Sequence, residues 1–172
     1  INGTHNRTNF DLKRHMEYSG ISMEYLDPLT NEKYVPFVIE STYGLDRTVL
    51  ALLFDAYHEE KIEDDTREVL KLHPFLAPFK VAVLPLAKKY HSEKAREIYE
   101  MLSKSFMTSY DEAGSIGKRY RRADAIGTVY SLTVDDNTLN NNTVTLRDRD
   151  TMKQITIPLD EVKNYVEEKI KF

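Results

Sequence analysis

One short stretch, residues 38–53 with the sequence VIESTYGLDRTVLALL, carries residue types that can bind a charged ligand. Glu40 ends an apolar run, and Arg47 lies in the expected first turn of the helix that follows. A helix N-terminus presents free backbone N–H groups and a partial positive charge, so an arginine there adds a forked donor to a position already suited to phosphate. The alternative is that Asp46 compensates the helix dipole, that Arg47 is solvated and that Glu40 pairs with a neighbour.

A second stretch, residues 114–127 with the sequence GSIGKRYRRADAIG, gathers four cations around one tyrosine: Lys118, Arg119, Tyr120, Arg121 and Arg122. If the stretch is helical, three of the cations share a broad face that can follow a nucleic-acid backbone, while the tyrosine can stack on a base. The alternative is a solvated cationic helix that pairs with nearby acids.

Other kinds of chemistry find little support. The chain has no cysteine, which excludes disulfides, thiol nucleophiles and thiolate zinc sites. The five histidines are isolated, so no metal site is predicted, and neither a G-x-S-x-G motif nor a glycine-rich phosphate loop occurs. The run RDRD at 147–150 is expected to be an alternating strand with its charges on the solvated face.

The first half of the chain must position Glu40 and Arg47. Residues 22–40 are expected to form a hairpin around the turn cluster 27–31, with Pro36 disturbing its second arm. After Gly44 the apolar spacing becomes helical, which predicts a helix from Leu45 to about His58. The run after it is acidic, then amphipathic, and ends at Pro74.

A second domain is expected to begin near His73. Its predicted strands are 79–84, 106–111, 128–134, 143–150 and 152–159, and its predicted helices are 92–104, 114–127 and 158–172. Asn140, Asn141 and Asn142 are expected to form a hairpin turn. The element order β-α-β-α-β-β-β-α predicts a mixed sheet with helices packed on it.

Charge is distributed unevenly along the 172 residues, whose net charge is −4. Residues 1–73 hold 8 Lys and Arg against 14 Asp and Glu, whereas residues 74–172 hold 16 against 14. The second part is therefore the better candidate for meeting phosphates. No apolar stretch approaches the roughly 18 residues of a membrane helix, and no signal peptide is seen, so we expect a cytoplasmic protein without a membrane partner. Because the sequence lacks an initial Met, we expect a fragment.

Five ordered blocks resemble the C-terminal part of a class II glycyl-tRNA synthetase of the dimeric type: NRTNFDLKRH, VIESTYGLDRTVLALL, LHPFLAPFKVAVLPL, GSIGKRYRRADAIGT and TVTLRDRDTMKQ. The resemblance runs from about Ile1 to the end of the chain. It implies an α/β (α+β) protein in which residues 1–72 end the antiparallel-sheet catalytic core. Residues 73–172 would be a mixed-sheet α/β anticodon-binding domain whose KRYRR helix contacts tRNA.

The resemblance also implies roles near the first stretch. Gly44, Asp46 and Arg47 would belong to motif 3 of the class II fold. Gly44 and Arg47 would bind ATP, and Arg47 would be catalytic, neutralising charge on the ATP phosphates beside Mg²⁺. Glu40 and Thr42 would line the glycine pocket. Family members commonly show Glu-Pro-Ser here, whereas this chain has Ser41 and Thr42 after the glutamate.

The implied function is that of glycine–tRNA ligase, which activates glycine with ATP to glycyl-adenylate and transfers it to tRNA(Gly), as a homodimer when full length. Motifs 1 and 2 would lie upstream of Ile1, so the fragment alone is expected to be inactive. The alternative is a non-catalytic synthetase-like protein, such as an accessory subunit of a DNA polymerase or another nucleic-acid-binding relative.

Overall fold

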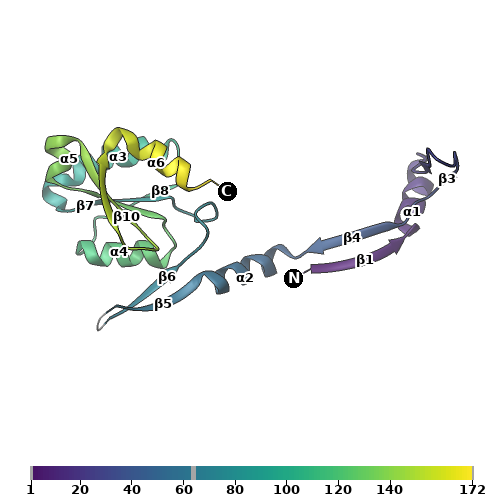
Figure 1. Ribbon diagram of the computed structural model, residues 1–172, viewed down its shortest axis with the longest axis horizontal. Helices are drawn as coiled ribbons and strands as arrows, with labels where there is room; N and C mark the ends of the chain where they lie inside the picture. Colours follow the sequence, from purple (N-terminus) through teal and green to yellow (C-terminus); the bar gives the residue numbers. More distant parts are fainter. Residues whose placement is uncertain (1, 63–64, 172) are drawn as a thin grey trace. The chain divides into compact units, whose positions relative to one another are not determined.

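The computed structural model describes residues 2–62 and 65–171 (Figure 1). The chain divides into two units, residues 1–51 and 52–172, and the division falls inside helix α2, Leu45–Ala56. The second unit thus begins well before His73, where the sequence predicts the start of a second domain. It includes the β5–β6 hairpin, which the sequence analysis placed in the first domain with the rest of residues 1–72.

The first unit is built from short strands and helices. Its remaining elements are β1 Asn2–Thr8, α1 Phe10–Ser19, β2 Tyr25–Leu26, β3 Lys33–Tyr34 and β4 Val38–Tyr43. β2 and β3 pair antiparallel, which confirms a hairpin around the turn at 27–31. β4 pairs antiparallel with β1.

The hairpin is shorter than expected, and its turn explains where it lies. The carboxylate of Asp27 accepts a hydrogen bond from the backbone N–H of Leu29 at 2.8 Å, and Asn31 adopts the left-handed conformation with φ 56°. Both are typical turn chemistry. Because Pro36 has no N–H to donate, the pairing ends before it, and the chain resumes as β4 against a different partner.

The second unit opens with an antiparallel hairpin and continues as an α/β domain. Its elements are β5 Tyr57–Ile62, β6 Asp65–Leu70, β7 Val81–Pro85, α3 Lys88–Ser103, β8 Thr108–Tyr110, α4 Ile116–Ala125, β9 Tyr130–Val134, α5 Asp136–Asn141, β10 Thr143–Asp148, β11 Gln154–Pro158, a 3₁₀ turn Leu159–Glu161 and α6 Val162–Lys169. Five strands form one sheet in the order β11-β10-β9-β7-β8. β7 is parallel to β8 and β9, while β10 is antiparallel to β9 and β11, so the prediction of a mixed sheet is confirmed.

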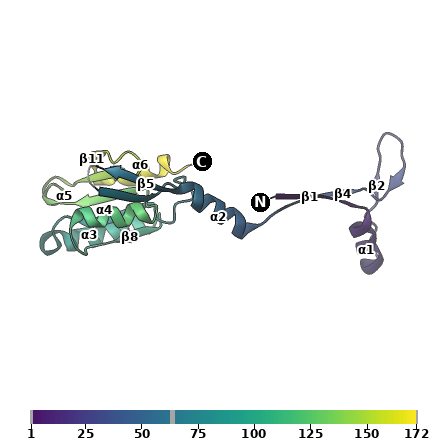
Figure 2. The ribbon, with the colours of Figure 1, turned by 90° about the horizontal axis from the view of Figure 1, so that it is seen from below.

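Helices cover both faces of this sheet (Figures 1 and 2). α3 and α6 pack on the face that carries Val81 and Val83 of β7, and α4 packs on the face that carries Ala82 and Leu84. All five residues of β7 are buried, as its unbroken apolar sequence predicts. Packing against the sheet therefore fixes the position of α4, which bears the basic residues.

The three asparagines do not form a hairpin turn, contrary to the prediction. Asn140 and Asn141 end helix α5, and Asn142 follows it in the left-handed conformation with φ 53°. The helix forms because Asp135 caps it: its carboxylate accepts from the N–H of Thr138 at 3.1 Å, and the Thr138 hydroxyl accepts from the N–H of Asp135. This reciprocal capping box outweighs the turn preference of the asparagines.

Gly127 lies where the β5–β6 hairpin meets the end of α4. It follows α4 with φ +79°, and a Cβ built there would lie 2.9 Å from the carbonyl oxygen of Leu70 at the end of β6. Only glycine meets both demands at low cost. β6 can therefore lie directly against the end of α4.

Candidate functional site

Glu40 and Thr42 point the same way from β4, because alternate residues of a strand share a face. The Thr42 hydroxyl donates to Glu40 Oε1 at 2.8 Å, and Arg7 Nε lies 3.6 Å from the other carboxylate oxygen of Glu40. Both side chains are exposed. The structure thus brings together the two residues assigned to glycine binding, and it adds Arg7 from β1, which the sequence analysis missed.

Arg7 is held in place by a second carboxylate. Its Nε and Nη2 donate to the two oxygens of Asp11 at 2.8 and 3.0 Å, four residues further along the chain. The hydrogen bonds with Arg7 hold the pKa of Asp11 below its usual range. Arg7 therefore bridges Asp11 and Glu40, so the alternative in which Glu40 has a basic neighbour is also realised.

Arg47 lies in the first turn of α2 and is exposed. Within residues 2–62 and 65–171, its guanidinium makes no hydrogen bond or ion pair. The stem of Arg47 covers Gly44, since a Cβ at Gly44 would lie 3.6 Å from Arg47 Cδ. The first N–H groups of α2 and this guanidinium can therefore meet one anion together.

The basic stretch forms helix α4, as predicted, but its cations are not equivalent. Lys118 is exposed, Arg121 donates to the Asp65 carboxylate of β6 at 2.8 Å, and Arg122 contacts Asp111 at 2.6 Å. Both arginine side chains remain more than one third exposed. Three of the four predicted cations thus reach the surface, two of them with acidic partners.

Arg119 is not on that surface, contrary to the prediction. Only 4% of the residue is exposed, and its guanidinium donates to the carbonyl oxygens of Pro85 and Gly114, the latter at 2.6 Å. The physical reason is helical spacing: with Ala123 four residues later, Arg119 lies on the side of α4 that faces the sheet.

Tyr120 is partly buried as well. Its hydroxyl shares a hydrogen bond with that of Thr133 on β9 at 2.6 Å, and the Arg147 guanidinium lies 4.9 Å from its ring centre. The ring therefore packs between α4 and the sheet and already has a cation on it. In this arrangement Tyr120 secures the helix on the sheet.

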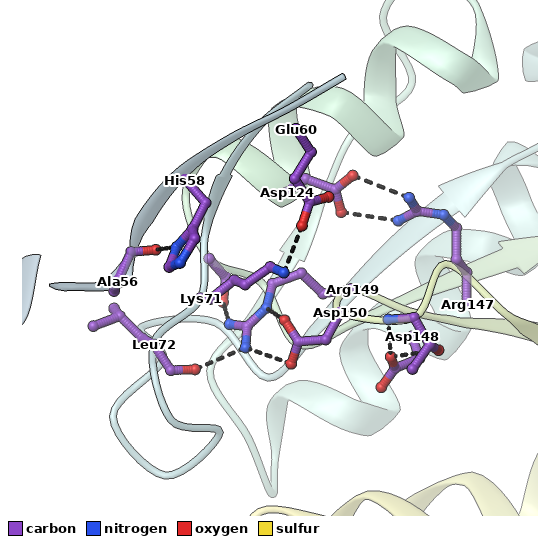
Figure 3. Close-up of polar contacts among 12 residues, drawn as sticks. Ala56, His58, Glu60, Lys71, Leu72, Asp124, Arg147, Asp148, Arg149 and Asp150 are labelled. Atoms are coloured by element: carbon purple, nitrogen blue, oxygen red, sulfur yellow. Dashed lines mark hydrogen bonds and ion pairs between the residues drawn. The ribbon is translucent and has the colours of Figure 1, made fainter. Parts of the chain in front are cut away.

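A network of buried charged residues, which sequence reasoning missed, joins α4 to β10 and the β5–β6 hairpin (Figure 3). Asp124 is 1% exposed and accepts from Arg147 at 2.8 and 3.0 Å, and from Arg67 Nε of the hairpin at 2.8 Å. Arg67 also donates to Glu60 at 2.7 Å. One carboxylate thus joins β6, α4 and β10.

The prediction that RDRD is a solvated strand face is wrong for its arginines. Arg147 and Arg149 are 7% and 2% exposed, while Asp150 lies toward solvent and pairs with Arg149 at 2.8 Å. Arg149 also donates to the carbonyl oxygens of Leu72 at 2.8 Å and Gly127 at 3.0 Å. The predicted strand is also too long, because β10 ends at Asp148 and Arg149 and Asp150 lie in the turn that follows. Both arginines are covered by their partners: Asp124 of α4 for Arg147, and the Gly127 and Leu72 carbonyls for Arg149.

In the part of the chain that the structure describes, none of the helices is long and apolar enough to cross a membrane. The same part of the chain also contains no group of three or more His, Cys, Asp or Glu residues arranged to hold a metal ion.

Comparison with known proteins identifies relatives over nearly the whole chain. It is 59% identical to a protein named glycine–tRNA ligase from Alkaliphilus metalliredigens over 171 residues, and 54% identical to one from Bacillus anthracis over 170 residues. In both cases 99% of this chain is covered, but only 37% of the relative. The chain therefore spans little more than a third of the length of these relatives.

The fold has a counterpart among solved structures. The RNA-binding domain of threonyl-tRNA synthetase from Cryptosporidium parvum Iowa II matches 85% of this chain and 34% of its own, with a TM-score of 0.65 and 24% identity. The model of the anticodon binding domain family matches residues 80–169, which include α4, the five-stranded sheet and the buried Arg147 and Arg149. Since this match covers more than half of the 172 residues, the chain belongs to the anticodon binding domain family.

Proposed function

We propose that this chain is the C-terminal part of a cytoplasmic glycine–tRNA ligase of the class II dimeric type. Residues 1–72 end the catalytic core, and residues 73–172 read the anticodon of tRNA(Gly). The observation that carries the proposal is the 54–59% identity to proteins named glycine–tRNA ligase over 99% of the chain. The whole enzyme joins glycine to tRNA(Gly) through glycyl-adenylate.

Glu40 and Thr42 bind the glycine ammonium in this proposal. Glycine offers only an ammonium and a carboxylate, so its pocket must pair those charges and exclude any side chain by bulk. A carboxylate with a hydroxyl fixed 2.8 Å from one of its oxygens suits a small cation. Arg7 Nε lies 3.6 Å from the Glu40 carboxylate, which is too far for a hydrogen bond. The carboxylate can therefore still accept hydrogen bonds from the glycine ammonium.

Arg47 and Gly44 bind the phosphates of ATP. The exposed guanidinium fits an anion, and Gly44, over which the stem of Arg47 lies, immediately precedes the first N–H groups of α2. ATP, accompanied by Mg²⁺, supplies the phosphoanhydride that activates the glycine carboxylate. Arg47 stabilises the charge that develops on the departing phosphates.

Lys118, Arg121 and Arg122 contact the tRNA backbone, while Arg119 and Tyr120 hold α4 on the sheet. The net charge of +2 over residues 74–172 favours this half of the chain for RNA. Each phosphate neutralised on a single strand contributes about −0.7 to the slope of log affinity against log salt concentration. Three exposed cations therefore predict a slope near −2, less steep than four would give.

The deciding experiment is aminoacylation by the full-length protein with glycine, alanine and serine. Charging should be specific for glycine, and Glu40→Gln should abolish most of it. The exposed Glu32→Gln serves as the control and should leave it unchanged. Lack of charging by the full-length protein would favour a non-catalytic synthetase-like protein, whereas glycine-dependent pyrophosphate exchange by the 172-residue chain alone would refute the division of the active site proposed above.

A separate experiment tests the RNA surface. Replacing both Arg121 and Arg122 with alanine should make the salt slope for tRNA(Gly) binding shallower by about 1.4. The double variant Lys163→Ala, Lys169→Ala on α6, across the sheet from α4, should leave it unchanged. Equal slopes in all three proteins would remove α4 from the interface.

A further inference from the structure

A cavity of about 300 Å³ lies on the face of the sheet opposite α4, near the C-terminal end of α6. Leu146 of β10 and Ile155 of β11, which are directly paired, supply its apolar surface, and Tyr130 and Tyr165 border it. Its volume is at the lower end of the range of about 300–1,000 Å³ typical of small-ligand pockets. The cavity therefore suits a small molecule with an apolar part.

Tyr130 brings a hydroxyl to the cavity from a side chain that is otherwise buried. The residue is 5% exposed, and its ring packs edge-on against Tyr165 with the ring centres 5.8 Å apart. The hydroxyl makes no hydrogen bond to any residue that the structure describes. Buried polar groups are nearly always paired, so this one calls for an acceptor that a ligand can bring.

The Tyr130 hydroxyl is a hydrogen-bond donor at neutral pH. Burial, followed by the nearby Tyr165, Asp148 and Asp150, raises the pKa of Tyr130 above its ordinary value. The hydroxyl therefore keeps its proton and can donate to an oxyanion, whereas an ionised phenolate could only accept.

Two lysines supply positive charge at the cavity. Lys153 follows the β10–β11 turn, and Lys169 lies in the last turn of α6. Neither ammonium makes an ion pair within residues 2–62 and 65–171. Lys163 on the same helix differs, because its ammonium lies 3.8 Å from the Glu167 carboxylate. The two cavity lysines are thus available to an anion.

Asp148 limits how much negative charge the cavity can accept. It also lines the cavity, but its Oδ1 already accepts from the backbone N–H and the hydroxyl of Thr151, at 2.7 and 2.8 Å. Two ammonium groups against one carboxylate leave a single net positive charge among the described residues that line the cavity. This balance favours a monoanion such as a carboxylate over a doubly charged phosphate, which Asp148 would repel.

We propose that this cavity binds a small organic carboxylate whose carbon skeleton is apolar or aromatic. The carboxylate accepts hydrogen bonds from Tyr130 and from the two lysines, and the carbon skeleton packs on Leu146 and Ile155. The cavity and α4 lie on opposite faces of the sheet, so this site is separate from the RNA surface proposed above and does not depend on it.

Benzoate is the test ligand, because it joins one carboxylate to a flat apolar ring. It should bind the 172-residue chain saturably, and the NMR chemical shifts that change should belong to the residues that line the cavity. Benzamide, which has the same shape without the charge, should bind at least about tenfold more weakly, since hydrogen bonds to charged groups are the stronger ones. Inorganic phosphate should not displace benzoate at equal concentration.

Tyr130→Phe removes the hydroxyl and keeps the ring. Because the hydroxyl has no partner among the described residues, the unfolding temperature of the ligand-free chain should be unchanged. Benzoate binding should weaken about tenfold, the scale expected when a hydrogen bond to a charged group is lost. Tyr99→Phe, on α3 and packed against the same core but outside the cavity, should bind benzoate as wild type does.

The double variant Lys153→Gln, Lys169→Gln tests the charge at exposed positions where folding is not at stake. It should weaken benzoate binding about tenfold and leave benzamide binding unchanged. Lys163→Gln is the matched control on α6 and should change neither.

Three results would overturn the proposal: no saturable benzoate binding, benzamide binding equal to that of benzoate, or benzoate binding unchanged in both Tyr130→Phe and the lysine double variant. Displacement of benzoate by phosphate would overturn the choice of a carboxylate. None of these results bears on the proposed function, which is tested by aminoacylation.

Discussion

Arg67 on β6 donates through Nε to the carboxylate of Asp124 on α4 at 2.8 Å, and both side chains are at most 1% exposed. The pair joins residues 57 positions apart and fastens the hairpin to the α/β domain. Arg147 completes it by donating twice to the same carboxylate. Asp124 is therefore a counter-charge shared by two buried arginines.

Breaking this pair should destabilise the second unit strongly. Arg67→Met leaves the carboxylate of Asp124 with one arginine instead of two, and removing one partner of a buried pair costs about 3–5 kcal/mol. Urea denaturation should show this loss in the free energy of unfolding. Arg14→Met, which removes an exposed pair with Glu17, should change it by less than about 1 kcal/mol. Similar losses of unfolding free energy in both variants would show that the buried pair stabilises the protein no more than the exposed one does.

Gly127 offers a second test of the contact between hairpin and domain. Gly127→Ala should cost about 2–4 kcal/mol, because the methyl group meets the Leu70 carbonyl at 2.9 Å in a left-handed backbone conformation. Gly114→Ala has φ +73° but meets only Lys118 Cδ at 3.8 Å. It should therefore lose only the conformational part, about 1–2 kcal/mol. Thermal unfolding of the two variants measures the difference, and equal losses would exclude a steric role for Leu70.

Glu112 should make stability depend on pH in the acid range. Hydrogen bonds from Lys88, Tyr110 and Ser92 lower the pKa of its carboxyl from 4.5 to about 2. Because the folded-state pKa lies below the unfolded one, the stabilisation is complete above pH 4.5 and is lost as the pH falls toward 2. Between pH 5 and pH 3, the free energy of unfolding should fall less in Glu112→Gln than in wild type. The exposed Glu100→Gln should match wild type, and a loss in Glu112→Gln equal to that of wild type would contradict the assignment.

Lys80 should hold the segment that precedes β7. Its ammonium donates to the carbonyl oxygens of Pro74, Phe75 and Ala77 at 2.7–2.8 Å, and burial lowers the pKa of the ammonium. Lys80→Met removes all three hydrogen bonds and should cost about 1–3 kcal/mol. Faster hydrogen exchange at residues 73–77 should accompany the loss. Lys104→Met, at an exposed position, should show neither effect.

Sequence reasoning located the α/β domain well because its signals are local. The unbroken apolar run of β7 and the helical spacing of α4 depend only on neighbouring residues, and both elements formed where expected. Asn142 shows the opposite case, since the capping box between Asp135 and Thr138 decided the local structure. That motif can be read from sequence once a helix start is considered.

The buried charges could not be predicted in the same way. Arg147 lies on β10 and Arg149 in the turn after it, but whether Arg149 is solvated depends on Arg67 and Leu72, which are 82 and 77 residues away from it in the chain. Helical spacing does place Arg119 on the side of α4 that carries Ala123, away from the face shared by the other three cations. The prediction that Arg119 also contacts tRNA did not follow that spacing. Contacts between residues far apart in the sequence produce no local pattern of this kind from which they could be predicted.

The family match begins at residue 80, yet Arg67 and the Leu72 carbonyl supply partners to Asp124 and Arg149 inside it. A truncation at the family boundary would strip two buried polar groups of a partner while deleting no residue of the matched region. The structural unit is thus longer than the residues that the family model matches. Any transfer of this domain to another chain should carry the hairpin from Tyr57 with it.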